Sequence, residues 1–347
     1  GGIMFVPNGF AEGWGLREKV RERIKERIMQ RAKGDDSQKA GKAYPLIEGE
    51  YTSYEQSPYG SGEYRRYIQY GTLKRFYEIH VPQSYNKEKA TAVVLNFHGG
   101  GGNPSQQRND SQMDIVSDAN NFIVVYPAGT GKLKERFLTF NAGVCCGYAK
   151  ENNIDDVGFT KAILDDLAAF FHINPKRIYA AGFSNGAFMC YRLAFQLADR
   201  IAAIAPVSGV IGIDISQYKP ARAISVIHFH GLEDMHVAYN GGVGQKAQEK
   251  IPRLSVADSI QYWIKYNGCS LKQPEELRKN AAVRTSYGQG TDGSEVVLWT
   301  LEDGGHAWPG GKSTLPEQSV GKLNRDISAS ELMWEFFQEH SLPARGM

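Results

Sequence analysis

The sequence has few cysteines and no long apolar run. Four cysteines among 347 residues are too few for a disulfide scaffold, and their spacing matches no zinc template of paired C-x-x-C or H-x-x-x-H type. No stretch approaches the roughly 20 apolar residues needed to cross a bilayer. We therefore predict neither a metal site nor a transmembrane segment.

The sequence also lacks an excess of charge of either sign. Lys and Arg number 40 against 38 Asp and Glu, which gives a formal net charge of +2. A protein that binds the phosphate backbone carries a concentrated basic surface, so nucleic acid is not an expected partner. The 41% hydrophobic content is instead typical of a globular chain with one large core.

The four cysteines leave several pairings open. Cys145 and Cys146 are adjacent and could bridge each other, or one of them could reach Cys269. Cys190 is the fourth. Free buried thiols are the alternative, because a sequence does not supply the geometry that a disulfide requires.

The first 61 residues differ in composition from the rest. Leu16, Val20, Ile24 and Ile28 are spaced four apart within the charged segment 16–33, which predicts a helix with one aliphatic face. That face would dock on the body of the protein or on a partner, including a second copy of the chain; a helix on a membrane surface is the alternative. Residues 35–62 are polar and rich in Gly, Pro and Ser, as linkers are. We thus predict an N-terminal helix and linker arm over 1–61 and a catalytic domain over 62–347.

Apolar runs alternate with helical patterns from residue 64 onward. We predict an antiparallel pair over 64–70 and 74–81, and buried strands over 92–98, 122–129, 177–182, 202–209, 224–231 and 295–301. Helices are predicted near 156–171 and 185–197, and a last one opens with Ser328 and Glu331 at capping-box spacing. Helices between near-continuous apolar strands indicate an α/β fold, with a mostly parallel central sheet covered by helices on both faces.

One G-x-S-x-G pentapeptide, residues 182–186, occurs in the chain. It follows the predicted strand 177–182 and precedes a predicted helix, which is the strand–turn–helix context of a nucleophile elbow. The flanking glycines let helix and strand approach closely enough to expose the central hydroxyl. We therefore predict Ser184 as a nucleophile.

A serine nucleophile needs a base and a group that orients the base. His306 lies in a Gly-rich loop directly after the predicted strand 295–301, and Asp234 follows the strand 224–231 in the same way. The carboxyl ends of parallel strands are where open α/β sheets build their sites. We predict His306 as the base and Asp234 as the acid, with Glu233 as the alternative acid. The order Ser, Asp, His is that of α/β-hydrolases.

The glycine-rich loop 98–103 follows the predicted strand 92–98. Such a loop contributes one backbone N–H to an oxyanion hole, and the residue after the nucleophile contributes the other. Gly100 and Asn185 are the predicted donors. A phosphate-binding loop is the competing interpretation, but no Lys-Ser/Thr follows and no G-x-G-x-x-G leads into a helix.

Taken together, these motifs resemble the esterase family of polyhydroxybutyrate depolymerases and the related LpqC-type feruloyl esterases. The matching segments run in order from about residue 62 to residue 340: HGGGGN, NAGVCCGYAKENNIDDVGF, RIYAAGFSNGAFMCYRLA, ADRIAAIAPVSG, HFHGLEDMHVAYNGG, YNGC and GGHAWPGG. In that family the elbow serine, the aspartate of HG-x-x-D and the histidine of GGH-x-WPGG form the triad, which carries over to Ser184, Asp234 and His306. Phe140 is a departure, because related sequences often have Trp there.

The resemblance implies an α/β-hydrolase that cleaves carboxylic esters through an acyl-enzyme, without a cofactor. Expected substrates are hydroxycinnamate (feruloyl-type) esters or short hydroxyalkanoate and polyester esters, with Trp308 and Gly101 as substrate contacts; core packing is the alternative role for Trp308. A secreted or periplasmic location is favoured over a cytoplasmic one, although no signal peptide is visible. Two alternatives are a peptidase on the same fold and a non-catalytic polymer- or carbohydrate-binding relative.

Overall fold

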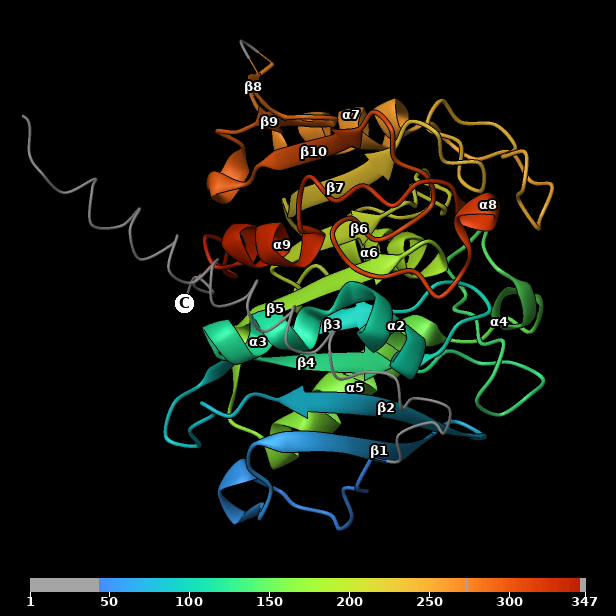
Figure 1. The fold of residues 1–347 in the computed structure, drawn as a ribbon. Helices are drawn as coiled ribbons and strands as arrows, with labels where there is room; N and C mark the ends of the chain where they lie inside the picture. Colours follow the sequence, from blue (N-terminus) through green and yellow to red (C-terminus); the bar gives the residue numbers. More distant parts are fainter. Residues whose placement is uncertain (1–43, 272–273, 344–347) are drawn as a thin grey trace, which may run out of the picture.

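The computed structural model describes residues 44–271 and 274–343. Among them, ten strands form one sheet in the order β1-β2-β4-β3-β5-β6-β7-β10-β9-β8 (Figure 1). The strands are β1 Gly62–Tyr70, β2 Leu73–Val81, β3 Thr91–Phe97, β4 Phe122–Pro127, β5 Ile173–Phe183, β6 Ala203–Val207, β7 Ser225–Gly231, β8 Glu275–Lys279, β9 Ala282–Tyr287 and β10 Val296–Leu301. The predicted helix over 16–33 lies outside the described residues.

The middle of this sheet is parallel and its two edges are antiparallel. Strands β4, β3, β5, β6, β7 and β10 pair in parallel. The hairpin β1–β2 extends one edge and the hairpin β8–β9 the other, both antiparallel. The hairpin at residues 64–81 was expected from the sequence; the short strands β8, which is exposed throughout, and β9, which is partly buried, were not.

Helices cover both faces of the sheet (Figure 1). The α-helices are α2 Pro104–Ser111, α3 Met113–Asn120, α4 Gly147–Glu151, α5 Asp156–Phe170, α6 Asn185–Gln196, α7 Val256–Asn267, α8 Glu317–Val320 and α9 Ala329–Phe337; the 3-10 turns are η1 Tyr54–Gln56 and η2 Thr291–Gly293. Ser328 caps α9, since its hydroxyl accepts a hydrogen bond from the Glu331 N–H. Helices α5, α6 and α9 were expected from the sequence, whereas α7 was not.

The core is divided into two layers by the sheet. On β3, Val93 and Leu95 join the layer that contains the buried residues of α5, α6 and α7, while Ala92 and Val94 join the layer beneath α3 and α9. Alternate residues of a strand point to opposite faces, so a strand buried on both faces must be apolar throughout. This is why the central strands could be recognised as uninterrupted apolar runs.

The direction in which the chain builds the sheet reverses at β3. Strand β4 lies on one side of β3, and β5, the next strand in the chain, lies on the other. The loops that leave the carboxyl ends of β3 and β5 therefore diverge, and such a switch point opens a crevice above the sheet. The predicted oxyanion loop and Ser184 both leave the sheet at this place.

Residues 44–61 pack against the body of the protein. Ile47 is 3% exposed, and its N–H donates to the Arg65 carbonyl of β1. The guanidinium of Arg66 pairs with Glu50 and donates to the carbonyl of Gly49. The described end of the predicted linker thus contacts the first strand; the division of the chain at residue 62 stays a prediction. No helix among the described residues is long and apolar enough to cross a membrane.

Candidate active site

Ser184 stands at the turn between β5 and α6. Its backbone has φ 52° and ψ −115°, which is strained for a residue with a side chain. The turn is tightly packed, because a Cβ on Gly182 would lie 2.4 Å from the Gly186 carbonyl oxygen, and one on Gly186 would lie 2.2 Å from that of Phe97. Glycine at these two positions is what allows the helix to start against β3 and β5.

The side chains of Ser184, His306 and Asp234 meet above the sheet, although they lie far apart in the chain. His306 Nε2 is 2.9 Å from Ser184 Oγ, and His306 Nδ1 is 2.7 Å from Asp234 Oδ2. A carboxylate accepts, so His306 Nδ1 carries the proton and Nε2 is left to accept from the serine hydroxyl. The hydrogen-bonded chain matches the arrangement of a nucleophile, a base and an orienting acid.

Asp234 is the carboxylate that reaches His306, and Glu233 is exposed. Asp234 is 5% exposed, and its second oxygen, Oδ1, accepts hydrogen bonds from the N–H groups of His236 and Val237. Burial alone would raise the pKa of Asp234, but His306, with smaller contributions from His230 and the Val237 N–H, outweighs burial and brings the pKa below its usual value. The carboxylate is therefore ionised and held in one orientation.

The ring of His306 contacts two other rings. Phe183 lies 4.8 Å from it, centroid to centroid, and the His236 ring stacks on it at 4.7 Å. His236 Nε2 is itself hydrogen-bonded to the Ser319 carbonyl. His236 follows Asp234 by two residues, and this closeness to the acid places it against His306.

The glycine loop after β3 lies over the start of α6. A Cβ built on Gly100 would be 3.5 Å from the Cβ of Asn185. The Gly101 N–H donates to the Leu138 carbonyl and the Gly102 N–H to the Gly99 carbonyl, so these two amides are used within the structure. Gly100 is exposed, and its amide is the candidate donor from this loop. Gly101 is also exposed, but its amide is occupied, so a substrate contact at Gly101 stays a prediction.

Asn185 contributes to the site in two ways. As the first residue of α6, its N–H is not used by the helix's own hydrogen bonds, and a helix N-terminus favours developing negative charge. Its buried side chain exchanges hydrogen bonds with the main chain of Phe140, at 2.7 Å and 2.9 Å, and contacts Cys145 Sγ. The segment around the cysteine pair thus supports the start of α6. Sequence reasoning named the Asn185 amide but not this role of its side chain.

His98 fixes the glycine loop from below. Its Nε2 accepts from the Gly129 N–H at 3.0 Å, so its Nδ1 carries the proton and donates to the Gly99 carbonyl at 2.8 Å. Burial lowers the pKa of His98 to about 4, although the Gly99 carbonyl opposes this. The ring is therefore neutral near neutral pH and can play both roles.

Two aromatic residues singled out in the sequence belong to the core. Trp308 is 2% exposed, and its Nε1 donates to Ser330 at the start of α9. This corrects the expectation that Trp308 forms a substrate platform; core packing, the alternative, is its role. Phe140 is fully buried beside the ring of His98, so its departure from the family's Trp does not change an exposed surface.

Cys145 and Cys146 form a disulfide with each other, and Cys190 and Cys269 are free and buried. One of the pairings left open by the sequence is thus the one present. The disulfide lies next to the side chain of Asn185 through Cys145.

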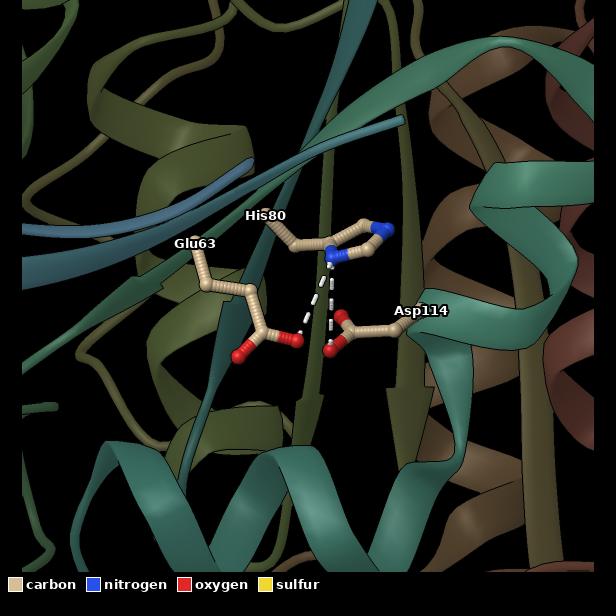
Figure 2. Close-up of side chains that lie close together, drawn as sticks. All are labelled: Glu63, His80 and Asp114. Carbon is tan, nitrogen blue, oxygen red and sulfur yellow. Dashed lines mark ion pairs between the residues drawn. The ribbon is translucent and has the colours of Figure 1, made fainter. Parts of the chain in front are cut away.

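Glu63, His80 and Asp114 form a partly buried ionic cluster on β1, β2 and α3 (Figure 2). His80 Nδ1 lies 3.9 Å from Glu63 and 3.7 Å from Asp114, an arrangement that could hold a cation. However, Arg108 donates to the same Asp114 oxygen at 2.9 Å, so a cation there would have to share that oxygen with a guanidinium. Burial lowers the pKa of His80, but Asp114 and Asp118 outweigh burial and raise it. We interpret the cluster as an ion-pair network, separated from Ser184 by β4 and β3.

Comparisons with known proteins point to esterases. No protein-family model matches the chain. Feruloyl esterase B of Piromyces equi is 31% identical over 270 residues, which is 76% of this chain and 45% of that protein. The chain thus spans less than half the length of this relative. Feruloyl esterase C of Emericella nidulans is 25% identical over 67% of this chain and 76% of its own length.

Among solved structures, the acetyl xylan esterase from Aspergillus awamori is similar in fold. It has a TM-score of 0.50 at 14% sequence identity, over 68% of this chain and 92% of that one. At this level of identity the similarity concerns the fold alone. Together with the mostly parallel sheet and its two helical layers, it confirms the predicted α/β-hydrolase fold.

Proposed function

We propose that the protein is a serine carboxylic-ester hydrolase that works through an acyl-enzyme. The observation that carries the proposal is the hydrogen-bonded series Ser184, His306 and Asp234, with distances of 2.9 Å and 2.7 Å. The esterase names of the relatives support it. The catalytic groups of this reaction are all side chains and amides of the chain, and water is the second substrate.

In the proposed reaction, Ser184 Oγ attacks the ester carbonyl carbon while its proton passes to His306 Nε2. Asp234 stabilises the imidazolium that forms, and the amides of Gly100 and Asn185 bind the negative oxygen of the tetrahedral intermediate. When the intermediate collapses, the alcohol leaves with the proton from His306. Water then attacks the acyl-enzyme by the same route and releases the acid and the free serine.

The decisive test is the Ser184→Ala variant. We expect ester turnover to fall by roughly a thousandfold or more, because only binding and the oxyanion donors remain. Circular dichroism and thermal unfolding should show a native fold. Undiminished hydrolysis by the purified, folded variant would exclude Ser184 as the nucleophile.

Hydroxycinnamate esters are the proposed substrate class, since the two relatives described above are named feruloyl esterases. Short hydroxyalkanoate esters are the second class, supported by the family resemblance of the motifs. Rates on methyl ferulate, a short p-nitrophenyl ester and a hydroxybutyrate oligomer should be measured side by side, with Ser184→Ala as the blank. A preference for the oligomer over methyl ferulate would reverse the assignment.

We also propose that the protein works in an oxidising compartment, outside the cytosol. The Cys145–Cys146 disulfide supports this, because disulfides persist in secreted and periplasmic proteins and are rare in the cytosol. Titration of the unfolded, unreduced protein should find two thiols, and reduction should raise this number to four. Four thiols before reduction would show that the disulfide is absent, and the proposal of an oxidising compartment would lose its basis.

A further inference from the structure

Two histidines of β7 lie side by side behind the proposed triad. His228 and His230 are both fully buried, and their rings are parallel, with an interplanar angle of 3° and centroids 5.3 Å apart. They are two residues apart on one strand, so their side chains point to the same face of the sheet. Neither has a role in the proposed reaction.

The hydrogen bonds of these histidines determine where each proton lies. His230 Nε2 is 2.8 Å from the Val237 carbonyl, which only accepts, so Nε2 carries the proton of His230. Burial lowers the pKa of His230, although Asp234 opposes this, and it lowers the pKa of His228 further, so both rings are neutral. His230 Nδ1 is therefore an acceptor, and His228 Nε2, 3.1 Å away, must donate to it.

The same reasoning extends the chain to α6. With its proton on Nε2, His228 has a lone pair on Nδ1, and the Tyr191 hydroxyl lies 2.7 Å from this atom. Tyr191 therefore donates to His228. All three hydrogen bonds run in one direction, from the helix that follows Ser184 to the loop that follows β7.

The end of this chain holds Asp234. Val237, whose carbonyl accepts from His230, donates its own N–H to Asp234 Oδ1 at 2.8 Å. His230 Nε2 also lies 3.5 Å from Asp234 Oδ2, the oxygen that faces His306. The proton of His230 thus points to the loop that orients the carboxylate and to the carboxylate itself.

We propose that Tyr191, His228 and His230 are positioning residues that act through Asp234. Their one-way chain of hydrogen bonds ties the acid loop to the nucleophile helix and presents a neutral N–H, with no second cation, behind the ionised Asp234. Because the chain is buried and every donor has an acceptor, reversing any one proton would leave two lone pairs or two N–H groups facing each other. This inference rests on the proposed function, since it assigns Asp234 to catalysis.

The direction of the chain can be tested without activity. Long-range ¹H–¹⁵N spectra of the histidine rings at pH 7 should show His228 and His230 as neutral Nε2–H tautomers. Assignment comes from loss of the corresponding signals in His228→Gln and His230→Gln. An Nδ1–H tautomer or a protonated ring at either residue would overturn the chain as drawn.

Kinetics tests whether the chain acts through Asp234. His230→Leu should lower kcat by roughly ten- to a hundredfold with KM little changed, because a misplaced acid weakens chemistry more than binding. His230→Gln, which can still donate an N–H to Val237, should recover much of the loss. When Asp234 is already replaced by Asn, adding His230→Leu should lower kcat almost no further. If the double variant loses as much additional kcat as His230→Leu loses in the wild-type protein, His230 does not act through Asp234.

A matched pair of tyrosine variants tests the Tyr191 end of the hydrogen-bonded series. Tyr191→Phe removes the hydroxyl that donates to His228, whereas Tyr239→Phe removes a hydroxyl that bonds Thr300 beside the edge of the His230 ring. We expect the first to lower kcat several-fold and the second to leave it unchanged. Equal effects would overturn the role of Tyr191. If the wild-type protein shows no ester turnover that Ser184→Ala abolishes, the proposed function fails instead, and the spectra still decide the chain.

Discussion

Two adjacent carboxylates, Glu233 and Asp234, differ in what surrounds them. Asp234 is buried and accepts from His306 and from two backbone amides, while Glu233 is exposed. Asp234→Asn should lower kcat by roughly ten-thousandfold, because the amide cannot hold the tautomer of His306 that accepts the serine proton. Glu233→Gln, the matched change one residue away, should leave kcat unchanged. Steady-state kinetics on one soluble ester decides between them, and a larger loss in Glu233→Gln would reverse the assignment of the acid.

A second residue-scale prediction concerns His98 and pH. The ordinary histidine pKa is 6.5 and that of buried His98 is about 4, so between these values the unfolded chain binds a proton that the folded protein does not. Stability from this residue is therefore complete above pH 6.5 and lost as the pH falls toward 4, by about 3 kcal/mol in total. The lowered pKa values of His228 and His230 act in the same direction.

Unfolding free energies measured by denaturant at pH 7 and pH 4.5 test this. His98→Gln has no titrating side chain at position 98, so its unfolding free energy should fall less between pH 7 and pH 4.5 than that of the wild-type protein. The comparison uses the change in unfolding free energy between the two pH values in each protein. The pH-independent destabilisation by the substitution and the titration of the carboxylates, which both proteins share, then cancel. An equal loss in both proteins would mean that His98 titrates normally when folded.

At the scale of elements, the close contact between α6 and the strands below it depends on Gly186. A methyl group there would lie 2.2 Å from the Phe97 carbonyl oxygen of β3, and backbone cannot move aside as a side chain can. Alanine stabilises a helix by roughly 1 kcal/mol relative to glycine, but overpacking costs about 1–3 kcal/mol or more. The steric cost should therefore exceed the gain in helix propensity. We expect Gly186→Ala to lower the unfolding free energy by about 2 kcal/mol and to reduce turnover.

The control is Gly288→Ala, at a position after β9 where an added Cβ meets no atom within 4 Å. Its melting temperature should stay close to that of the wild-type protein. If Gly186→Ala is equally stable and equally active, helix α6 can shift away from β3, and the tight turn is not needed to place Ser184.

At the scale of the whole molecule, truncation tests where the catalytic body begins. No proposed catalytic group lies within residues 1–43, so deleting residues 1–40 should leave turnover of a small soluble ester within a few-fold, with a changed melting temperature or oligomer size as the only consequence. Deleting residues 1–61 also removes buried Ile47 and the Glu50 partner of Arg66, and should lower the melting temperature clearly. A hundredfold loss of turnover in a folded 1–40 deletion would place the arm in the active site.

Local pattern was enough to predict much of this protein. The central strands are buried on both faces, so each is an apolar run in the sequence. The elbow at Ser184 could be recognised from its glycine spacing, although Gly182 is required by a contact with Gly186 and Gly186 by the more distant Phe97 carbonyl of β3. Asp234 and His306 were predicted because each follows a strand, and parallel strands end at the same edge. The exposed, charged strand β8 lacks such a simple pattern and went unpredicted. Helix α7 also went unpredicted, although its capping box at Ser255 and Asp258 and its amphipathic spacing are signals that could have found it.

The sequence by itself therefore determined the fold class, the strand ends that carry the proposed triad, and the glycines of its turns. Only the tertiary structure decided which way individual side chains face. Trp308, two residues after His306, is buried against α9, Cys145 pairs with its neighbour, and His228 and His230 connect Tyr191 to the loop of Asp234. The reason is physical. An apolar run or a regular spacing of residues reflects the geometry of one helix or strand, whereas the burial and hydrogen-bond partners of a side chain depend on elements that are distant in the chain.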